Sequence, residues 1–286
     1  MTTFTTLINT NELAANINNP AWVIIDCRFN LADTAAGRQA YAQTHLPNAR
    51  YAHLDEDLSS PIAPNTGRHP LPDPVVFAKK LGDWGVDENT QVVVYDDAGG
   101  AIAGRLWWML RWLGHDKVAL LNGGLKAWQV AGLPLSNEIL EDIPASFLPQ
   151  QAVYEQDALY VTADEVDQLR QNKEYCVIDA RAPQRFSGEV EPLDKVAGHI
   201  PGSINMPWDN NVQADGTFKS KETLQEMFKQ KLGDVAPEHV IHSCGSGVTA
   251  CHNLIAMEYA GLTGSKLYPG SWSEWITDPN RSVEKG

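Results

Sequence analysis

Short apolar runs alternate along the chain with segments of helical periodicity. Residues 22–26 and 91–95 are rich in β-branched and aliphatic side chains, which is typical of buried strands. Apolar side chains at helical spacing follow the second run, at Ile102, Leu106, Met109, Leu110 and Leu113. The second half of the chain has matching strand patterns at 175–179 and 240–243 and a helical pattern over 248–259. Because strands that alternate with helices pair in parallel, we predict an α/β fold of mainly parallel sheets flanked by helices.

The two halves of the chain resemble each other. Two sequence motifs recur, VIIDCR (23–28) as CVIDAR (176–181) and HLPNA (45–49) as HIPGS (199–203). Three single landmarks return 147 residues later: Gly114 as Gly261, Gly123 as Gly270 and Trp128 as Trp275. A duplication is the economical explanation. We therefore predict two tandem domains, 1–140 and 155–286, with their junction near residues 136–160.

The first copy contains about seven extra residues. The spacing between matching positions falls from 154 residues at His45 and His199 to 147 at the later landmarks. We assign the surplus to the polar, proline-rich segment 59–74, which is expected to form a long loop. A long loop in one copy only suggests a task that the other copy lacks.

Charge and composition narrow the possible partners. The chain carries 22 Lys and Arg against 36 Asp and Glu, a formal net charge of −14, so it repels polyanions and we expect no nucleic-acid partner. The start shows no basic segment before an apolar stretch, and the most apolar helical segment is interrupted by Arg111, so we expect no membrane association. The four cysteines show no spacing typical of zinc sites or disulfide scaffolds, which favours a reducing, cytoplasmic setting.

One cysteine lies where a thiolate is stabilised. Cys244 follows the predicted strand 240–243 and opens the loop CGSGVTA, after which a helix begins. A glycine-rich turn between a strand and a helix directs backbone N–H groups at one anionic atom, and the helix dipole adds positive charge there. Gly245 and Gly247 let the loop fold closely around the sulfur. We therefore expect Cys244 to be a nucleophile at neutral pH, rather than a small core residue beside a tight turn.

The first copy lacks this thiol. Asp97 stands 147 residues before Cys244, at the equivalent position. We therefore predict a non-catalytic domain at 1–140 and a catalytic domain at 155–286.

The chain resembles the two-domain rhodanese and 3-mercaptopyruvate sulfurtransferase family. The resemblance rests on the duplicated layout, the D-x-R and H-[IL]-P turns, the segment GSWSEW (270–275) and the loop CGSGVTA (244–250). The resemblance covers nearly the whole chain and implies two rhodanese-like domains. It also implies that Cys244 attacks a sulfur donor, carries a sulfane sulfur as a persulfide and passes it to cyanide or a thiol. In that arrangement the persulfide is held by backbone N–H groups of the loop, at Gly245, Gly247, Val248 and Thr249.

The residues after the cysteine bear on the donor. Family members that prefer thiosulfate tend to carry basic residues there, whereas the neutral Gly-Ser-Gly of this chain resembles the mercaptopyruvate enzymes. In those enzymes a loop serine works with a histidine and an aspartate from the first domain as a proton relay. Ser246 matches the serine, and His69 and Asp57, in or beside the extra loop, are the best candidates for the other two.

Mercaptopyruvate enzymes also resemble one another in holding the donor carboxylate with two arginines, whose planar forks suit that group. Arg185 matches the first arginine. The second falls near Asp194 and Lys195, where this chain has no arginine. Lys195 supplies a point charge without the fork, so thiosulfate stays open as the donor.

Three alternatives stand beside the mercaptopyruvate enzyme: a thiosulfate-preferring rhodanese, a persulfide carrier that delivers sulfur to a partner protein, and a cysteine phosphatase. The phosphatase is disfavoured because it needs an arginine closing the loop, where this chain has Ala250. No metal, nucleotide or flavin motif is evident, so we expect no cofactor beyond the covalent sulfur. We interpret Cys27, Cys176 and Cys251 as core cysteines, Arg28 and Arg181 as partners in structural salt bridges, and His45 and His199 as turn-fixing residues.

Overall fold

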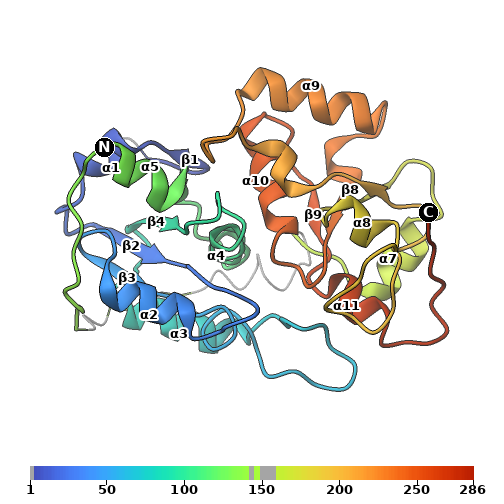
Figure 1. The fold of residues 1–286 in the computed structure, drawn as a ribbon, viewed down its shortest axis with the longest axis horizontal. Coiled ribbons are helices and arrows are strands. Elements are labelled where there is room, and N and C mark those ends of the chain that lie inside the picture. The colour runs from blue at the N-terminus through green and yellow to red at the C-terminus, as the bar shows by residue number, and fades with distance from the viewer. Residues whose placement is uncertain (1–2, 142–144, 149–158) are drawn as a thin grey trace. The chain divides into compact units, whose positions relative to one another are not determined.

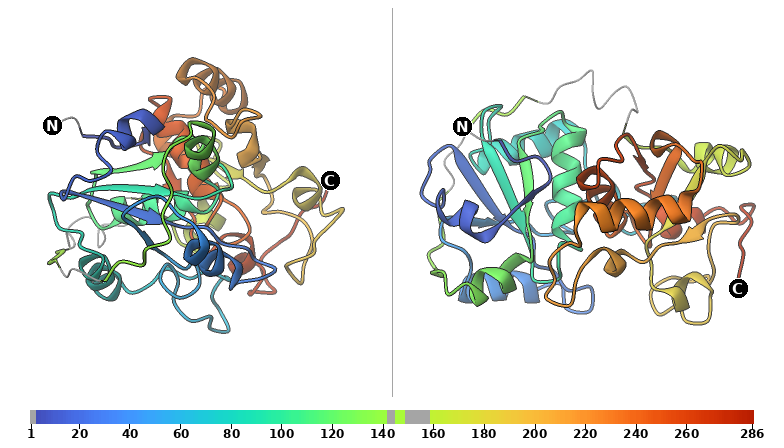
Figure 2. Two further views of the ribbon diagram at one scale, coloured as in Figure 1. Left: turned by 60° about the vertical axis from the view of Figure 1, so that its left-hand side comes forward. Right: turned by 90° about the horizontal axis from the view of Figure 1, so that it is seen from above.

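The computed structural model describes residues 3–141, 145–148 and 159–286. Its chain divides into two compact units, each built on one parallel sheet flanked by helices (Figures 1 and 2). The predicted α/β fold with two tandem sheets is confirmed. The predicted boundary, between residues 140 and 155, lies largely outside the described residues.

The sheet of the first unit has five strands in the order β1-β5-β4-β2-β3, and every pair is parallel. Its strands are β1 (Leu7–Ile8), β2 (Trp22–Asp26), β3 (Ala49–Tyr51), β4 (Gln91–Tyr95) and β5 (Val118–Leu121). Its helices within the described residues are α1 (Thr10–Ala14), α2 (Ala36–Gln43), α3 (Pro74–Asp83), α4 (Ala103–Trp112) and α5 (Gly124–Val130). Strand β4 is buried along its whole length, as its continuous apolar sequence predicts.

The sheet of the second unit has four strands in the order β7-β6-β8-β9, again all parallel. Its strands are β6 (Cys176–Asp179), β7 (Ile204–Asn205), β8 (Val240–Ser243) and β9 (Lys266–Leu267). Its α-helices are α7 (Ala163–Leu169), α8 (Pro183–Phe186), α9 (Lys221–Leu232), α10 (Ala250–Tyr259) and α11 (Ser271–Trp275), and its 3-10 helices are η1 (Trp208–Asn211) and η2 (Pro237–His239). A parallel bridge between Tyr160 and Leu267 extends this sheet where β1 extends the first sheet.

The duplicated motifs form the same contacts in both units. Arg28 forms a salt bridge with Asp26, at the end of β2. Arg181 forms the equivalent salt bridge with Asp179, at the end of β6. The Nη2–Oδ2 distance is 2.6 Å in both. The interpretation of both arginines as partners in structural salt bridges is therefore confirmed. His45 and His199 are also buried, and the Nδ1 atom of each contacts a backbone carbonyl, which agrees with their interpretation as turn-fixing residues.

Each unit also buries the matching tryptophan. Trp128 and Trp275 are both 0% exposed, and each indole N–H donates to a backbone carbonyl, of Pro134 and of Ser282 respectively. The large apolar area of each ring anchors its core, and the hydrogen bond satisfies the buried N–H group.

Two short segments belong to a different unit from the residues on either side of them in the sequence. Residues 61–71, from the long loop of the first half, belong to the second unit, whereas residues 212–218 belong to the first. The backbone N–H of Phe218 donates to Asn122 at 2.8 Å, which illustrates the second case. The predicted domains, 1–140 and 155–286, are contiguous in sequence and did not include this exchange of segments.

No helix among the described residues is long and apolar enough to cross a membrane.

His242 is a buried histidine in strand β8, two residues before Cys244. It is 0% exposed, and its Nε2 lies 3.1 Å from the Ser265 hydroxyl. Its Nδ1 is buried and has no hydrogen-bond partner in the described part of the chain. Burial therefore disfavours the charged ring and lowers the pKa of His242 to about 3.

Acid should destabilise the fold through His242. Between about pH 6.5 and pH 3, His242 is protonated in the unfolded chain but stays neutral in the folded chain. The free energy of unfolding is therefore expected to fall as the pH drops through this window, and His242→Gln should make that fall shallower. Urea unfolding of both proteins at several pH values tests this; an equally steep fall in the variant would contradict it.

Candidate active site

The predicted nucleophile lies between a strand and a helix, as the sequence indicates. Strand β8 ends at Ser243, Cys244 follows, and helix α10 begins at Ala250. The Cys244 side chain is only 2% exposed. Its backbone is held at both ends, because its N–H donates to Ser271 Oγ at 3.0 Å and its carbonyl accepts from Trp272 at 3.0 Å.

The loop after Cys244 presents backbone donors. Within the described residues, the N–H groups of Gly245, Ser246, Val248 and Thr249 have no hydrogen-bond partner in the protein. Gly247 has a φ of +72°, and a Cβ there would lie 2.1 Å from the Pro269 carbonyl, so only glycine fits. This tight turn keeps several amides available to an anion, as expected for a site that stabilises a thiolate or persulfide.

In the equivalent loop of the first unit, a carboxylate of the loop itself, that of Asp96, accepts hydrogen bonds from the backbone N–H groups. Asp96 is 1% exposed and accepts four backbone hydrogen bonds of 2.8–2.9 Å. The donors are the N–H groups of Ala98, Gly100, Ile102 and Ala103. The residue 147 positions later is Ser243, which has no carboxylate. The first unit therefore differs from the second in two ways: Asp97 replaces the thiol, and Asp96 occupies the amides.

Ser271 positions the start of the catalytic loop. It is 0% exposed, accepts from the Cys244 N–H and donates to the Tyr268 carbonyl at 2.9 Å. Its φ is +53°, a left-handed conformation that a non-glycine residue adopts at an energetic cost. The equivalent residue of the first unit is Gly124, with a φ of +55°. The second unit thus has a serine at this strained position, and its hydroxyl accepts a hydrogen bond from the Cys244 N–H.

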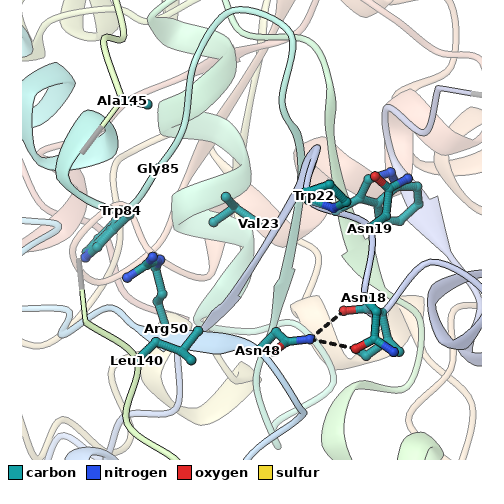
Figure 3. Close-up of a pocket in the computed structure, with 12 residues that line it drawn as sticks. Asn18, Asn19, Trp22, Val23, Asn48, Arg50, Trp84, Gly85, Leu140 and Ala145 are labelled. Atoms are coloured by element: carbon teal, nitrogen blue, oxygen red, sulfur yellow. Dashed lines mark hydrogen bonds between the residues drawn. The ribbon is translucent and has the colours of Figure 1, made fainter. Parts of the chain in front are cut away.

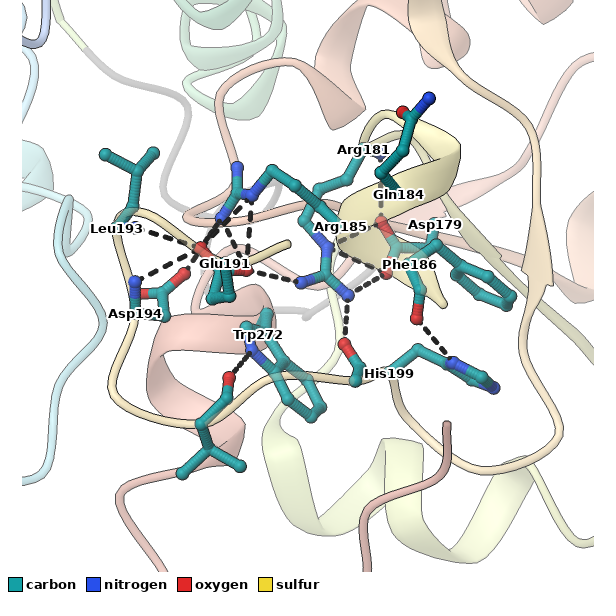
Figure 4. A network of polar contacts seen from close by, with 12 residues as sticks. Asp179, Arg181, Gln184, Arg185, Phe186, Glu191, Leu193, Asp194, His199 and Trp272 are labelled. Carbon is teal, nitrogen blue, oxygen red and sulfur yellow. Dashed lines mark hydrogen bonds and ion pairs between the residues drawn. The ribbon is translucent and has the colours of Figure 1, made fainter. Parts of the chain in front are cut away.

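Arg181, two residues after the end of strand β6, interacts electrostatically with Cys244. Arg181 is buried and pairs with Asp179 and Glu191, as Figure 4 shows. Burial alone lowers the pKa of Arg181, but Asp179, Glu191 and the Cys244 thiolate outweigh it and raise the pKa.

Ser246 and His69, two of the predicted relay residues, are in contact. Their Oγ and Nδ1 atoms lie 2.7 Å apart, and both side chains are buried. His69 belongs to residues 61–71, the segment of the long loop that is grouped with the second unit. A serine hydroxyl bonded to an imidazole is an arrangement that transfers protons.

Asp57, the predicted third member, lies in the first unit. Its carboxylate accepts from the His53 N–H at 2.8 Å and pairs with Lys80 at 2.7 Å. Its role in a relay stays a prediction.

The two predicted donor-binding cations differ in their surroundings. Arg185 lies beside the catalytic loop, since a Cβ on Gly245 would be 3.5 Å from its Nη1. Its Nη2 pairs with Glu191 at 2.8 Å and with Asp194 at 3.1 Å (Figure 4). Lys195 is exposed, and its ammonium makes no hydrogen bond or ion pair with the described residues. Arg185 is thus adjacent to the loop, and no contact links Lys195 to it.

The other cysteines are consistent with core positions. Cys27 and Cys251 are buried and Cys176 is half-buried, and all of them are free thiols. Burial raises the pKa of Cys176 to about 11, so it is a poor nucleophile at neutral pH. In the described ranges no group of three or more His, Cys, Asp or Glu side chains is placed to hold a metal ion.

The first unit contains a cavity of about 470 Å³, shown in Figure 3. Its lining includes Trp22, Asn48, Arg50 and Trp84. None of its lining residues is a cysteine or carries a carboxylate.

Comparison with known families agrees with this geometry. Residues 9–131 and 162–278 each match the rhodanese-like domain. The chain belongs to the rhodanese-like family. The two matches cover every strand of the two sheets except β1, so the predicted pair of rhodanese-like domains is confirmed.

Relatives of this rhodanese-like chain include sulfurtransferases of both donor types. A probable 3-mercaptopyruvate sulfurtransferase of Pseudomonas aeruginosa is 45% identical over 98% of each chain. A thiosulfate sulfurtransferase of Rattus norvegicus is 34% identical over 98% of this chain and 95% of its own. The crystal structure of SseA from Escherichia coli, described among 3-mercaptopyruvate sulfotransferases, has a TM-score of 0.77 and 33% identity, and the match covers 94% of this chain and all of that one. The predicted sulfurtransferase class is confirmed.

The sequence analysis missed several residues of this rhodanese-like site. Arg68 pairs with Asp194 at 2.6 Å, and its Nη2 would lie 3.1 Å from a Cβ on Gly245. Arg68 directly precedes His69, so the reasoning that selected the histidine could have selected the arginine. Ser271 stands in the GSWSEW segment, but no pattern in the sequence reveals its positive φ.

Replacing Ser271 should separate loop positioning from backbone strain. Ser271→Ala leaves the Cys244 N–H buried without a partner and is expected to cost about 1–3 kcal/mol of stability. Ser271→Gly loses the same hydrogen bond but relieves the left-handed strain, so it should be the more stable variant. Both should form the Cys244 persulfide more slowly. Urea unfolding and time-resolved intact mass measure the two effects; wild-type persulfide rates in both variants would contradict the positioning role.

Proposed function

We propose that the chain moves a sulfane sulfur from 3-mercaptopyruvate, through a persulfide on Cys244, to cyanide or a thiol acceptor. One set of contacts carries the proposal: Cys244 opens a loop of available amides, and Ser246 in that loop bonds His69 at 2.7 Å. The name of the Pseudomonas aeruginosa relative supports this donor. The name of the Rattus norvegicus relative supports thiosulfate as the alternative.

In the first step, the Cys244 thiolate attacks the sulfur of 3-mercaptopyruvate. An S–S bond forms and the C–S bond of the donor breaks, with its electron pair left on carbon as the enolate of pyruvate. The thiol proton of the donor is transferred to that carbon, so the products are pyruvate and the Cys244 persulfide. The donor carbon is reduced while the two sulfur atoms are oxidised, so the step needs no external oxidant.

Ser246 and His69 carry that proton in this proposal. The 2.7 Å contact supports a relay in which the Ser246 hydroxyl passes a proton between the reacting atoms and the imidazole. The relay is proposed on these two residues, because the contacts of Asp57 are to His53 and Lys80.

In the second step, cyanide or a thiolate attacks the outer sulfur. The S–S bond breaks, its electron pair returns to Cys244, and the product is thiocyanate or the persulfide of the acceptor. The amides of Gly245, Ser246, Val248 and Thr249, together with Arg181, stabilise the departing thiolate as they stabilise the attacking one.

Two alternatives share the same persulfide. A thiosulfate-preferring enzyme loads Cys244 from a dianion, and a carrier loads it once and delivers the sulfur to a partner protein. The neutral loop, with no Lys or Arg between Gly245 and Ala250, favours mercaptopyruvate over thiosulfate. We also propose a reducing, cytoplasmic location, which the free thiols support.

Loading of Cys244 and turnover test the function together. After exposure to 3-mercaptopyruvate, the intact protein is expected to gain the mass of one sulfur atom and to lose it when cyanide is added, with catalytic formation of thiocyanate. Cys244→Ser should abolish both, whereas the matched control Cys176→Ser should preserve both. A mass gain that persists in Cys244→Ser would sink the proposal, and loading without turnover on either donor would favour the carrier.

The relay should matter only for a donor that carries a proton. His69→Gln and Ser246→Ala are each expected to lower kcat with 3-mercaptopyruvate about 100-fold, and the double variant should be no slower than either. Thiosulfate has no thiol proton to move, so its kcat should change only a few-fold. Equal losses on both donors, in steady-state assays of thiocyanate, would return His69 to a structural role.

A further inference from the structure

Two guanidinium groups flank the residue that follows the nucleophile. A Cβ built on Gly245 would lie 3.1 Å from Arg68 Nη2 and 3.5 and 3.6 Å from Arg185 Nη1 and Nη2. Arg68 comes from the loop 61–71 and Arg185 from helix α8. Two distant parts of the sequence therefore place cations at one side of the Cys244 loop.

A single carboxylate joins the two cations. Asp194 accepts from Arg68 Nη1 at 2.6 Å through Oδ1 and from Arg185 Nη2 at 3.1 Å through Oδ2. Its side chain is only 4% exposed, so solvent screens these contacts weakly. Asp194 occupies the region where the family resemblance places an arginine. It thus fixes the distance and orientation between two forks that a donor anion would contact.

Three other donor groups of the two arginines have no hydrogen-bond partner among the residues that the structure describes. Arg68 Nε is buried without a hydrogen bond, and neither Arg68 Nη2 nor Arg185 Nη1 bonds any described residue. A carboxylate is the group that such guanidinium N–H donors suit best. Asp194 itself demonstrates that one carboxylate can bridge this pair.

The charges around these forks balance. The cations Arg68, Arg181 and Arg185 face an equal number of anions, Asp179, Glu191 and Asp194. The thiolate that the proposed function requires at Cys244 adds one further negative charge. A donor with one carboxylate adds less repulsion to this site than a dianion such as thiosulfate, because like charges repel more strongly where burial weakens screening.

We propose that Asp194 determines donor specificity: it aligns Arg68 with Arg185 as a clamp for the donor carboxylate, and its charge disfavours dianionic donors. The inference rests on the proposed function. It makes Arg68 a donor-binding residue and Asp194 a positioning residue. It also explains how this chain holds a carboxylate donor without an arginine at position 194 or 195.

The kinetic test compares both donors in Asp194→Asn, whose side chain has nearly the same shape without the charge. Its KM for thiosulfate is expected to fall and its KM for 3-mercaptopyruvate to rise, so the ratio of kcat/KM values should shift toward thiosulfate about 10-fold or more. Arg68→Met should raise the KM for 3-mercaptopyruvate about 10-fold with a smaller effect on kcat. Arg68→Lys should recover only part of the loss, since it restores the charge but not the fork. Arg38→Met, at an exposed Arg–Glu pair of the first unit, is the control.

A binding measurement keeps the test independent of turnover. In a Cys244→Ser background, calorimetry with pyruvate and with thiosulfate reports recognition of a carboxylate and of a dianion. Adding Asp194→Asn should weaken pyruvate binding and strengthen thiosulfate binding. Unchanged affinities, or a kcat/KM ratio within two-fold of wild type, would overturn the inference. Failure of the proposed function is a separate result, because Cys244 of the wild-type protein would then gain no sulfur from either donor.

Discussion

The site depends on backbone N–H groups that converge at the carboxyl end of a parallel strand. The fold builds this loop twice, after β4 and after β8. In the first unit Asp96 takes up four of the amides, so the loop is stabilised from within. In the second unit Ser243 stands at that position, and the amides of Gly245, Ser246, Val248 and Thr249 have no hydrogen-bond partner among the described residues. The two loops thus differ at two positions: Asp96 against Ser243, and Asp97 against Cys244.

Part of the long loop of the first half belongs to the second unit. Its residues 61–71 are grouped with the second unit, where His69 bonds Ser246 and Arg68 lies beside Gly245. The backbone N–H of Arg68 donates to Ser273 at 3.0 Å, which holds this segment against the GSWSEW region. One short piece of chain therefore places an imidazole against Ser246 and a guanidinium beside Gly245.

Fixed charges and dipoles lie beside the buried cysteine. Cys244 is 2% exposed. The loop that it opens carries amides, guanidinium groups lie beside that loop, and paired carboxylates keep those cations in place. Such a site stabilises charge by fixed dipoles that need no rearrangement during the reaction.

Local sequence determined much of this protein. Apolar runs identified β2, β4, β6 and β8, the repeat identified two units, and the strand, glycines and helix around Cys244 predicted that it is the nucleophile, because each of these signals depends on neighbouring residues. The contacts between Asp194 and the two arginines, the positive φ of Ser271 and the carboxylate of Asp96 within its loop were decided by tertiary structure. They join side chains and backbone groups whose meeting depends on how the sheets and loops close in space, which no periodicity or spacing records.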